Sequence, residues 1–193
     1  MTSSAFRIET RALAGDKRET DARIFLWATP RSISTALERV MKNADGLDVL
    51  HEPFTDTYYF SSKRRSRRYG DPAVPAQDPV EADAVNARLE EAGRRGPVFI
   101  KDLAFQAEPY VTDALLATAR NIFLTRDPLK VYASLIRIKP DFTEDEFGFT
   151  ALERIWNRVH ALQGAAIALD GEEFRADPHA IAYKLCVWSD VRY

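Results

Sequence analysis

The sequence has little of what several classes of protein require. Only one of its 193 residues is a cysteine, Cys186, which excludes an intrachain disulfide framework and a zinc site built from cysteines. No apolar run approaches the roughly 20 residues needed to cross a membrane. The first twenty residues lack the apolar centre of a signal peptide. We therefore expect a cytoplasmic protein with no membrane contact and no metal site.

An excess of charge of one sign is also missing. Lys and Arg number 27 and Asp and Glu number 29, which leaves a formal charge of −2 and no global attraction to nucleic acid. One local exception is the basic run 63–68, Lys-Arg-Arg-Ser-Arg-Arg. This run is compatible with a solvated loop, with a lid over an anion-binding site or with a segment that binds an anionic acceptor. Because no known nucleic-acid-binding module accompanies it, we expect no nucleic-acid partner.

Short apolar runs alternate with amphipathic helical patterns along the chain. The expected strands are 23–28, 47–50, 98–100, 121–124 and 165–169. The expected helices are about 33–41, 78–92, 109–119, 128–138, 143–163 and one that starts at 178, with 55–78 irregular. This alternation predicts one α/β domain over 23–193, with three layers: a mainly parallel five-stranded sheet and helices on both faces. Residues 1–22 form a polar N-terminal tail.

The turn after the first expected strand combines a cation with several hydroxyl groups. It reads Ala-Thr-Pro-Arg-Ser-Ile-Ser-Thr over residues 28–35. Parallel sheets bind ligands at the carboxyl ends of their strands, where the next helix presents free N–H groups. These N–H groups, Arg31 and the neighbouring hydroxyls suit the oxygens of a phosphate-like group. The alternative is an ordinary helix start with hydroxyl caps and a solvent-exposed arginine.

A second candidate anion contact follows the fourth expected strand. Arg126 leaves that strand, and Ser134 lies eight residues later on the next helix, so one extended phosphate could touch both. The alternative is an arginine paired with a local carboxylate and a surface serine. Neither segment is an ordinary nucleoside-triphosphate loop, because the pattern G-x-x-x-x-G-K-[ST] is missing from the sequence.

These segments resemble the sulfotransferase family. Residues 29–35 are similar to its 5′-phosphosulfate loop, commonly written P-[RK]-S-G-[ST]-T. Arg126, the Asp-Pro pair that follows it and Ser134 resemble the 3′-phosphate motif, R-x-P with a serine eight residues after the arginine. Residues 170–178 resemble the strand-loop-helix near the end of the family's core. The resemblance spans about residues 23–186 and keeps the order of the three motifs.

The resemblance implies a P-loop-like sulfotransferase fold and the donor 3′-phosphoadenosine 5′-phosphosulfate (PAPS), with no metal. The reaction would move a sulfuryl group in line to a hydroxyl or amine of a small-molecule acceptor and release adenosine 3′,5′-bisphosphate (PAP). The residues that would hold the 5′-phosphosulfate are Pro30, Arg31, Ser32, Ile33, Ser34 and Thr35. Arg126 and Ser134 would hold the 3′-phosphate.

The resemblance also suggests which groups carry the chemistry. In several branches of the family a glutamate at the place of Glu52 is the general base, which takes the acceptor proton. Other branches use a histidine in a K-T-H pattern, but here that stretch reads Lys-Asp-Leu over 101–103. We therefore predict Glu52 as the base, with His51 as a substitute, and Arg31 and Lys101 as cations at the leaving oxygen. The alternatives are a capping or salt-bridging Glu52 and a solvent-exposed Lys101.

Two features depart from the family's pattern. Ile33 stands where glycine is usual, so we expect a negative φ there. The sequence ends at Tyr193 before the basic, glycine-containing loop with which relatives cover the 3′-phosphate. The chain could therefore be C-terminally truncated, or it could close its site in another way. It could also be a degenerate relative or a non-catalytic nucleotide- or anion-binding domain. A phosphotransferase that uses magnesium and a nucleoside triphosphate is a further alternative.

The acceptor is not indicated by any motif. Aromatic residues in 53–70 and 139–150 suit either an aromatic acceptor or simple packing.

Overall fold

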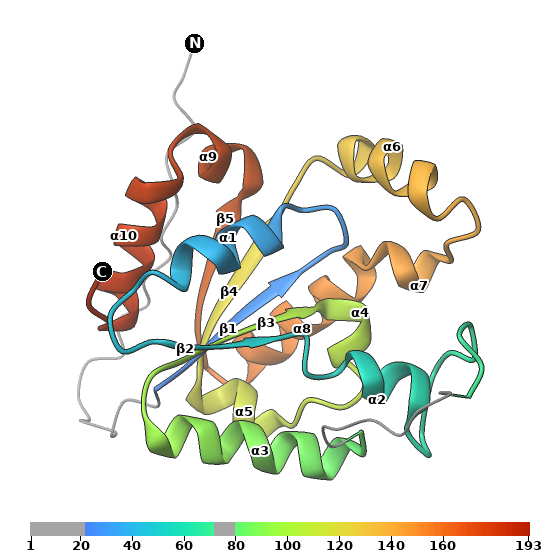
Figure 1. Cartoon of the computed structure of the whole chain (residues 1–193), viewed down its shortest axis with the longest axis horizontal. Coiled ribbons are helices and arrows are strands. Elements are labelled where there is room, and N and C mark those ends of the chain that lie inside the picture. Colours follow the sequence, from blue (N-terminus) through green and yellow to red (C-terminus); the bar gives the residue numbers. More distant parts are fainter. Residues whose placement is uncertain (1–21, 72–79) are drawn as a thin grey trace.

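The computed structural model describes residues 22–71 and 80–193, and at its centre lies a five-stranded sheet. The strands are β1 (Arg23–Ala28), β2 (Asp48–His51), β3 (Val98–Leu103), β4 (Arg120–Thr125) and β5 (Ala165–Asp170). They lie in the order β2-β3-β1-β4-β5, and every neighbouring pair is parallel (Figure 1). All five expected strands are confirmed, and the sheet is wholly rather than mainly parallel.

Helices make up most of the rest of the described chain. They are α1 (Ser34–Met41), α2 (Thr55–Phe60), α3 (Ala82–Arg95), α4 (Ala104–Ala107), α5 (Asp113–Thr118), α6 (Pro128–Ile138), α7 (Glu144–Phe147), α8 (Phe149–Ala161), α9 (Gly171–Ala176) and α10 (Pro178–Ser189). Within residues 22–71 and 80–193, no helix is both long enough and apolar enough to cross a membrane.

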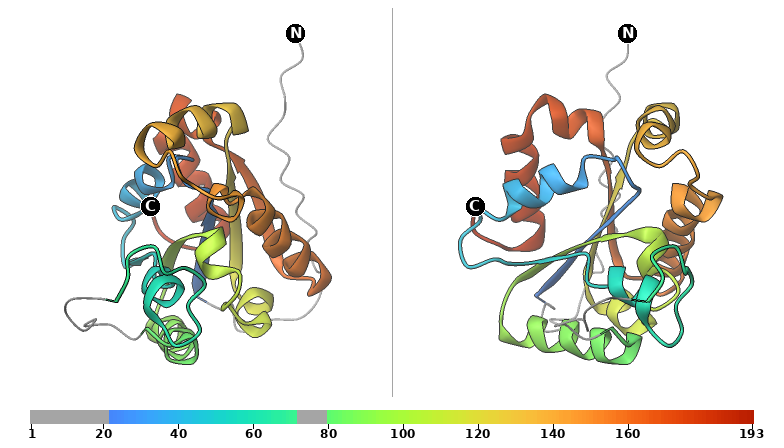
Figure 2. Two further views of the ribbon diagram at one scale, coloured as in Figure 1. Left: turned by 90° about the vertical axis from the view of Figure 1, so that its right-hand side faces the viewer. Right: turned by 45° about the vertical axis from the view of Figure 1, so that its right-hand side comes forward.

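The helices cover both faces of the sheet, so the expected three layers are confirmed. Side chains of a strand alternate between the two faces, and those of β1 enter two separate cores. Phe25 and Trp27 pack with side chains of α3, α4, α5 and α8. Ile24 and Leu26 pack on the opposite face with side chains of α1, α9 and α10. Figure 1 and the turned views of Figure 2 show these layers.

The capping signals read from the sequence set several helix starts. Asp127 caps α6 and Asp177 caps α10, each with a proline at the start of the helix. Thr143 and Glu146 form the predicted capping box, but the single helix expected over 143–163 is wrong. The chain forms α7 and α8 instead, because Gly148 between them adopts a left-handed conformation with φ 84°. A Cβ atom at Gly148 would lie 3.1 Å from Pro30 Cδ, so this break packs against the loop after β1.

Short helices account for the other differences from the expected elements. Residues 55–60 form α2 rather than an irregular segment, and α4 and α9 were not expected. Helices of four to six residues are too short to show an amphipathic period. The helix expected over 109–119 starts only at Asp113, because Thr112 caps it. The expected cap at 78–79 and the tail of residues 1–21 lie outside the described residues.

Candidate functional site

The loop between β1 and α1 holds two residues in the left-handed conformation. Arg31 has φ 60° and Ile33 has φ 67°, so the negative φ expected at Ile33 is wrong. Such a conformation costs a residue with a Cβ atom about 1–3 kcal/mol and tends to occur at functional sites. Ile33 takes the backbone conformation that glycine would take, and its carbonyl accepts hydrogen bonds from Ala36 and Leu37 at the start of α1.

Side-chain contacts fix this loop. The hydroxyl of Ser32 is buried and donates to the carbonyl of Thr29 at 2.7 Å, so it closes the turn. Ser34 is buried and Thr35 is exposed, both in the first turn of α1. The first N–H groups of a helix have no partner within it. Loop 28–35 therefore presents backbone donors and a cation, Arg31, at the carboxyl end of β1.

Arg31 and Arg126 join the two predicted anion motifs into one cluster. Arg31 Nε donates to Ser134 Oγ of α6 at 2.9 Å. Arg126 Nη1 donates to the Arg31 carbonyl at 3.0 Å, although the two residues are 95 positions apart in the sequence. Its Nε donates to Glu172 Oε1 of α9 at 3.1 Å. The structure thus brings Arg31, Arg126 and Ser134 together, and Arg126 also has the local carboxylate partner that the alternative predicted.

The third motif, around residue 171, packs against the other two. A Cβ atom at Gly171 would lie 3.1 Å from the Thr125 carbonyl and 3.4 Å from that of Ser32, so only glycine allows this approach without a shift. Next to it, the ammonium of Lys130 and the guanidinium of Arg126 hold the pKa of Glu172 below its ordinary range. The three segments that resemble the sulfotransferase motifs therefore lie in contact with one another.

Glu52 and Lys101 meet at the carboxyl ends of the neighbouring strands β2 and β3. Lys101 Nζ forms an ion pair with a carboxylate oxygen of Glu52, and the backbone N–H of Glu52 donates to the Lys101 carbonyl at 2.7 Å. Lys101 is buried, so the solvent-exposed alternative for this lysine is wrong. Glu52 also has a left-handed backbone, with φ 43°. Its carboxylate is partly exposed and accepts a hydrogen bond from Thr55 Oγ1 at 3.1 Å.

His51 lies beside Glu52, and its ring lies between two carboxylates. Its Nδ1 is 2.6 Å from Glu38 Oε2 of α1, and its Nε2 is 3.8 Å from Glu52 Oε1. More than half of the His51 side chain is exposed. A pocket of about 330 Å³ opens here, lined by Leu50, His51, Glu52, Pro53, Thr55, Asp56 and Arg88. Both candidate bases are therefore accessible to a small molecule.

Asp102, which the sequence did not indicate, lies beside the Glu52–Lys101 pair. It is fully buried, and its two carboxylate oxygens accept the N–H groups of Phe54 at 2.9 Å and Leu103 at 2.8 Å. The bond to Phe54 holds the turn that follows Glu52. Burial raises the pKa of Asp102 to about 8. The sequence offered only an aspartate beside Lys101, with nothing to indicate a partner 48 residues away.

The remaining histidines lie away from these groups. His160 Nδ1 is 2.9 Å from the Trp156 carbonyl, and His179 Nδ1 is 2.7 Å from the Tyr193 hydroxyl. In the described part of the chain, no group of three or more His, Cys, Asp or Glu residues could hold a metal ion.

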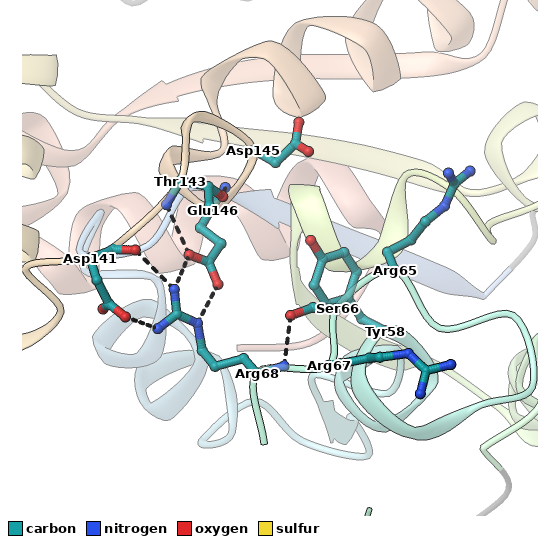
Figure 3. Close-up of a pocket in the computed structure, with 9 residues that line it drawn as sticks. All are labelled: Tyr58, Arg65, Ser66, Arg67, Arg68, Asp141, Thr143, Asp145 and Glu146. Atoms are coloured by element: carbon teal, nitrogen blue, oxygen red, sulfur yellow. Dashed lines mark hydrogen bonds and ion pairs between the residues drawn. The ribbon is translucent and has the colours of Figure 1, made fainter. Parts of the chain in front are cut away.

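Part of the basic run is attached to the protein rather than solvated. Arg64 pairs with Asp71 at 2.7 Å. Arg68 reaches across to the segment before and within α7, where it pairs with Asp141 at 2.6 Å and with buried Glu146 at 3.0 Å (Figure 3). A second, larger pocket opens between these segments.

Comparisons with known proteins agree with this architecture. A family model described as a sulfotransferase domain matches residues 22–193. A solved sulfotransferase from Alicyclobacillus acidocaldarius superposes with a TM-score of 0.55 at 17% identity, covering 87% of this chain and 80% of that one. The YorR protein of Bacillus subtilis, solved in complex with phosphorylated GDP, superposes with a TM-score of 0.53 at 12% identity, covering 87% and 95%. At these identities the solved structures show a shared fold.

A curated relative is much longer than this chain. Branched-chain-amino-acid aminotransferase-like protein 2 from Arabidopsis thaliana is 25% identical over 163 residues, which are 84% of this chain but 29% of that protein. The chain therefore spans less than a third of the length of this relative. The sulfotransferase-domain model, by contrast, covers the chain from residue 22 to its last residue, and on that match the chain belongs to the sulfotransferase family.

Proposed function

We propose that the chain transfers the sulfuryl group of PAPS to a hydroxyl or amine of a small-molecule acceptor. The observation that carries this proposal is the cluster formed by Arg31, Arg126 and Ser134, in which Arg31 contacts both of the others. Two cations that follow separate strands, β1 and β4, converge with a hydroxyl of α6 beside the start of α1. Such a cluster suits a ligand with two separated anionic groups.

The donor would lie across this cluster with its two anionic ends apart. Loop 28–35 would hold the 5′-phosphosulfate through Arg31, the first N–H groups of α1 and the Thr35 hydroxyl, with Ser32 keeping the turn closed. Arg126 and Ser134 would hold the 3′-phosphate. The strain stored at Arg31 and Ile33 supports a binding role, because a loop with a purely structural role has no need of two unfavourable backbone conformations.

The transfer needs a cation at the leaving oxygen and a base at the acceptor. The bond from sulfur to the acceptor oxygen forms while the bond from sulfur to the bridging phosphate oxygen breaks. PAP leaves with that electron pair, and the start of α1, Arg31 and Lys101 would stabilise its growing charge. Glu52 would take the acceptor proton. The pocket beside Glu52 supports this assignment, since it leaves the partly exposed carboxylate accessible to an acceptor.

A non-catalytic nucleotide-binding domain is the second candidate function. The observation in its favour is that the charges of the site already balance one another, Glu52 with Lys101 and Arg126 with Glu172. This candidate predicts that the chain binds PAP and does not turn over PAPS with any acceptor.

Thermal unfolding with added nucleotides tests the donor site. A ligand at ~100 times its dissociation constant adds about 2.7 kcal/mol to the free energy of unfolding, which raises the midpoint by roughly 5–10 °C at this chain length. We expect this rise with PAP and not with ADP or magnesium-ATP. We expect Arg126→Ala to abolish it, because the variant loses the guanidinium proposed to bind the 3′-phosphate.

The matched control is Arg39→Ala, which removes an exposed arginine of α1 outside the cluster. This variant should keep the full rise with PAP. Equal stabilisation by ADP, or an unchanged response in Arg126→Ala, would contradict the proposed donor site. The midpoint of each variant without nucleotide separates lost binding from lost stability.

A further inference from the structure

The larger pocket lies between the segment after α2 and the segment before and within α7 (Figure 3). It measures about 560 Å³, which is within the range of small-molecule sites. We call it the arginine pocket. It is lined by Tyr58, Arg65, Ser66, Arg67, Arg68, Asp141, Thr143, Asp145 and Glu146.

The wall formed by the basic run is held in place by hydrogen bonds. The backbone N–H groups of Arg65 and Ser66 both donate to the Tyr58 carbonyl, at 3.0 and 3.2 Å. Arg68 donates to both carboxylate oxygens of Glu146, each at 3.0 Å, and to Asp141. Because Arg68 ties the two walls together, the residues between it and Tyr58 are presented on a fixed backbone.

The acidic side chains at the Arg68 end are already neutralised. Arg68 holds the pKa of Asp141 below its ordinary range. Burial alone would raise the pKa of Glu146, but hydrogen bonds from Lys139, the Thr143 N–H and Arg68 outweigh it and lower the pKa. The charges of these two carboxylates are balanced by the guanidinium of Arg68 and the ammonium of Lys139, which lies 2.7 Å from Glu146 Oε1.

Arg65 and Arg67 supply the charge that remains on this wall. Neither guanidinium forms an ion pair or a hydrogen bond with any residue in 22–71 or 80–193, and Figure 3 shows both directed away from Arg68. Asp145, on the other wall, likewise has no ion-pair partner among the described residues. Burial, and then the charge of Asp145, raise the pKa of Tyr58 to about 12, so its hydroxyl stays neutral and can donate to an anion.

Both walls of the pocket are joined along the chain to segments of the proposed reaction centre. Tyr58 lies in α2, which begins at Thr55, three residues after Glu52. On the other side, Gly148 follows α7 and packs against Pro30 of loop 28–35. An elongated acceptor could then place a hydroxyl beside Glu52 and its other end in the arginine pocket.

We infer that the arginine pocket binds an acidic group of the acceptor, a carboxylate or a phosphate, through Arg65 and Arg67. The substrate of the proposed transfer is then an anionic hydroxy compound rather than a neutral one. This inference rests on the proposed function for the transfer step, but binding of the acidic group can be measured without it. An arginine fork matches the oxygens of both groups, so the test includes one probe of each kind.

Calorimetric titration of the full chain, saturated with PAP, tests the inference. The acidic probes are 4-hydroxyphenylacetate and 4-hydroxyphenyl phosphate, and the neutral probe is 4-hydroxyphenylacetamide. We expect at least one acidic probe to bind about tenfold or more tightly than the amide, as charge-assisted hydrogen bonds predict. The double variant Arg65→Ser/Arg67→Ser should lose about ten- to hundredfold in affinity for that probe and bind the amide as the wild type does.

The matched control is Lys63→Ser/Arg39→Ser, which removes two exposed cations that do not line the pocket. It should bind the acidic probe normally. Equal affinity for acid and amide, an unchanged affinity in the Arg65/Arg67 double variant, or an equal loss in the control would each overturn the inference. If PAP itself does not bind, the proposed function fails, and the same titrations without PAP still decide the inference about the pocket.

Discussion

Replacing Glu52 with glutamine is expected to lower sulfuryl-transfer turnover about 10²- to 10⁴-fold and to leave PAP binding unchanged. Glutamine keeps an oxygen that can accept a hydrogen bond from Lys101, but it cannot take up the acceptor proton. The fall should therefore be in kcat rather than in the affinity for nucleotide. Initial rates with sulfur-labelled PAPS and a mixture of phenolic, alcoholic and amine acceptors measure it.

Two further variants test whether a loss of turnover is specific to the carboxylate of Glu52. Glu153→Gln, an exposed glutamate of α8 without an ion-pair partner in the described chain, should keep wild-type turnover. His51→Ala should keep most of it, since His51 Nδ1 is 2.6 Å from Glu38 Oε2, whereas its Nε2 is 3.8 Å from Glu52 Oε1. Full turnover in Glu52→Gln combined with a large loss in His51→Ala would assign the base to His51 and refute the choice of Glu52.

Asp102→Asn is expected to change how the stability of the protein depends on pH. Burial raises the pKa of Asp102 from 3.8 to about 8, so between these values the folded state binds a proton that the unfolded state has lost. The contribution of Asp102 to stability is therefore greatest at low pH. It falls by about 1.4 kcal/mol per pH unit between about pH 5 and 7, and levels off above the folded pKa. Asparagine does not titrate, so the variant should lack this slope.

Thermal unfolding of wild type and variant at pH 5, 6 and 7 measures the effect. The difference between their midpoints should change by roughly 5–10 °C over this range. Asp48→Asn, which replaces an exposed aspartate of β2, should show the wild-type pH dependence. Identical pH profiles for the wild type and Asp102→Asn would show that Asp102 is ionised in the folded protein at neutral pH, and the expected protonated state would then be wrong.

The strands and the convergence of the anion motifs were predictable because each rests on local sequence. Every strand is a short apolar run that ends at polar or helix-capping residues, and the carboxyl ends of parallel strands meet at one edge. Arg31 and Arg126 each lie just beyond such an end. The structure adds that β1 and β4 are neighbours in the sheet, which brings Arg31 into direct contact with Ser134 and Arg126.

The features that were missed depend on contacts between distant segments. The left-handed conformation of Ile33 is unfavourable in isolation. Contacts with distant segments help to hold this loop, such as the hydrogen bond from Arg126 to the carbonyl of Arg31, two residues before Ile33. Lys101 is buried because β2 brings Glu52 to it from 49 positions away. Arg68 is fixed by Glu146, 78 positions along the chain. No pattern within a short window of sequence identifies such partners, so burial and pairing of charged residues required the folded structure.

The choice of donor is the central claim, and transfer of label by the wild-type chain tests it most directly. Parallel reactions would contain either sulfur-labelled PAPS or γ-phosphate-labelled ATP with magnesium, each with the same mixture of acceptors and the acidic hydroxy compounds named above. We expect label to move from PAPS to an acceptor, with or without a chelator of divalent metals, and none to move from ATP. Transfer of phosphate from magnesium-ATP with no transfer from PAPS would contradict the proposed donor.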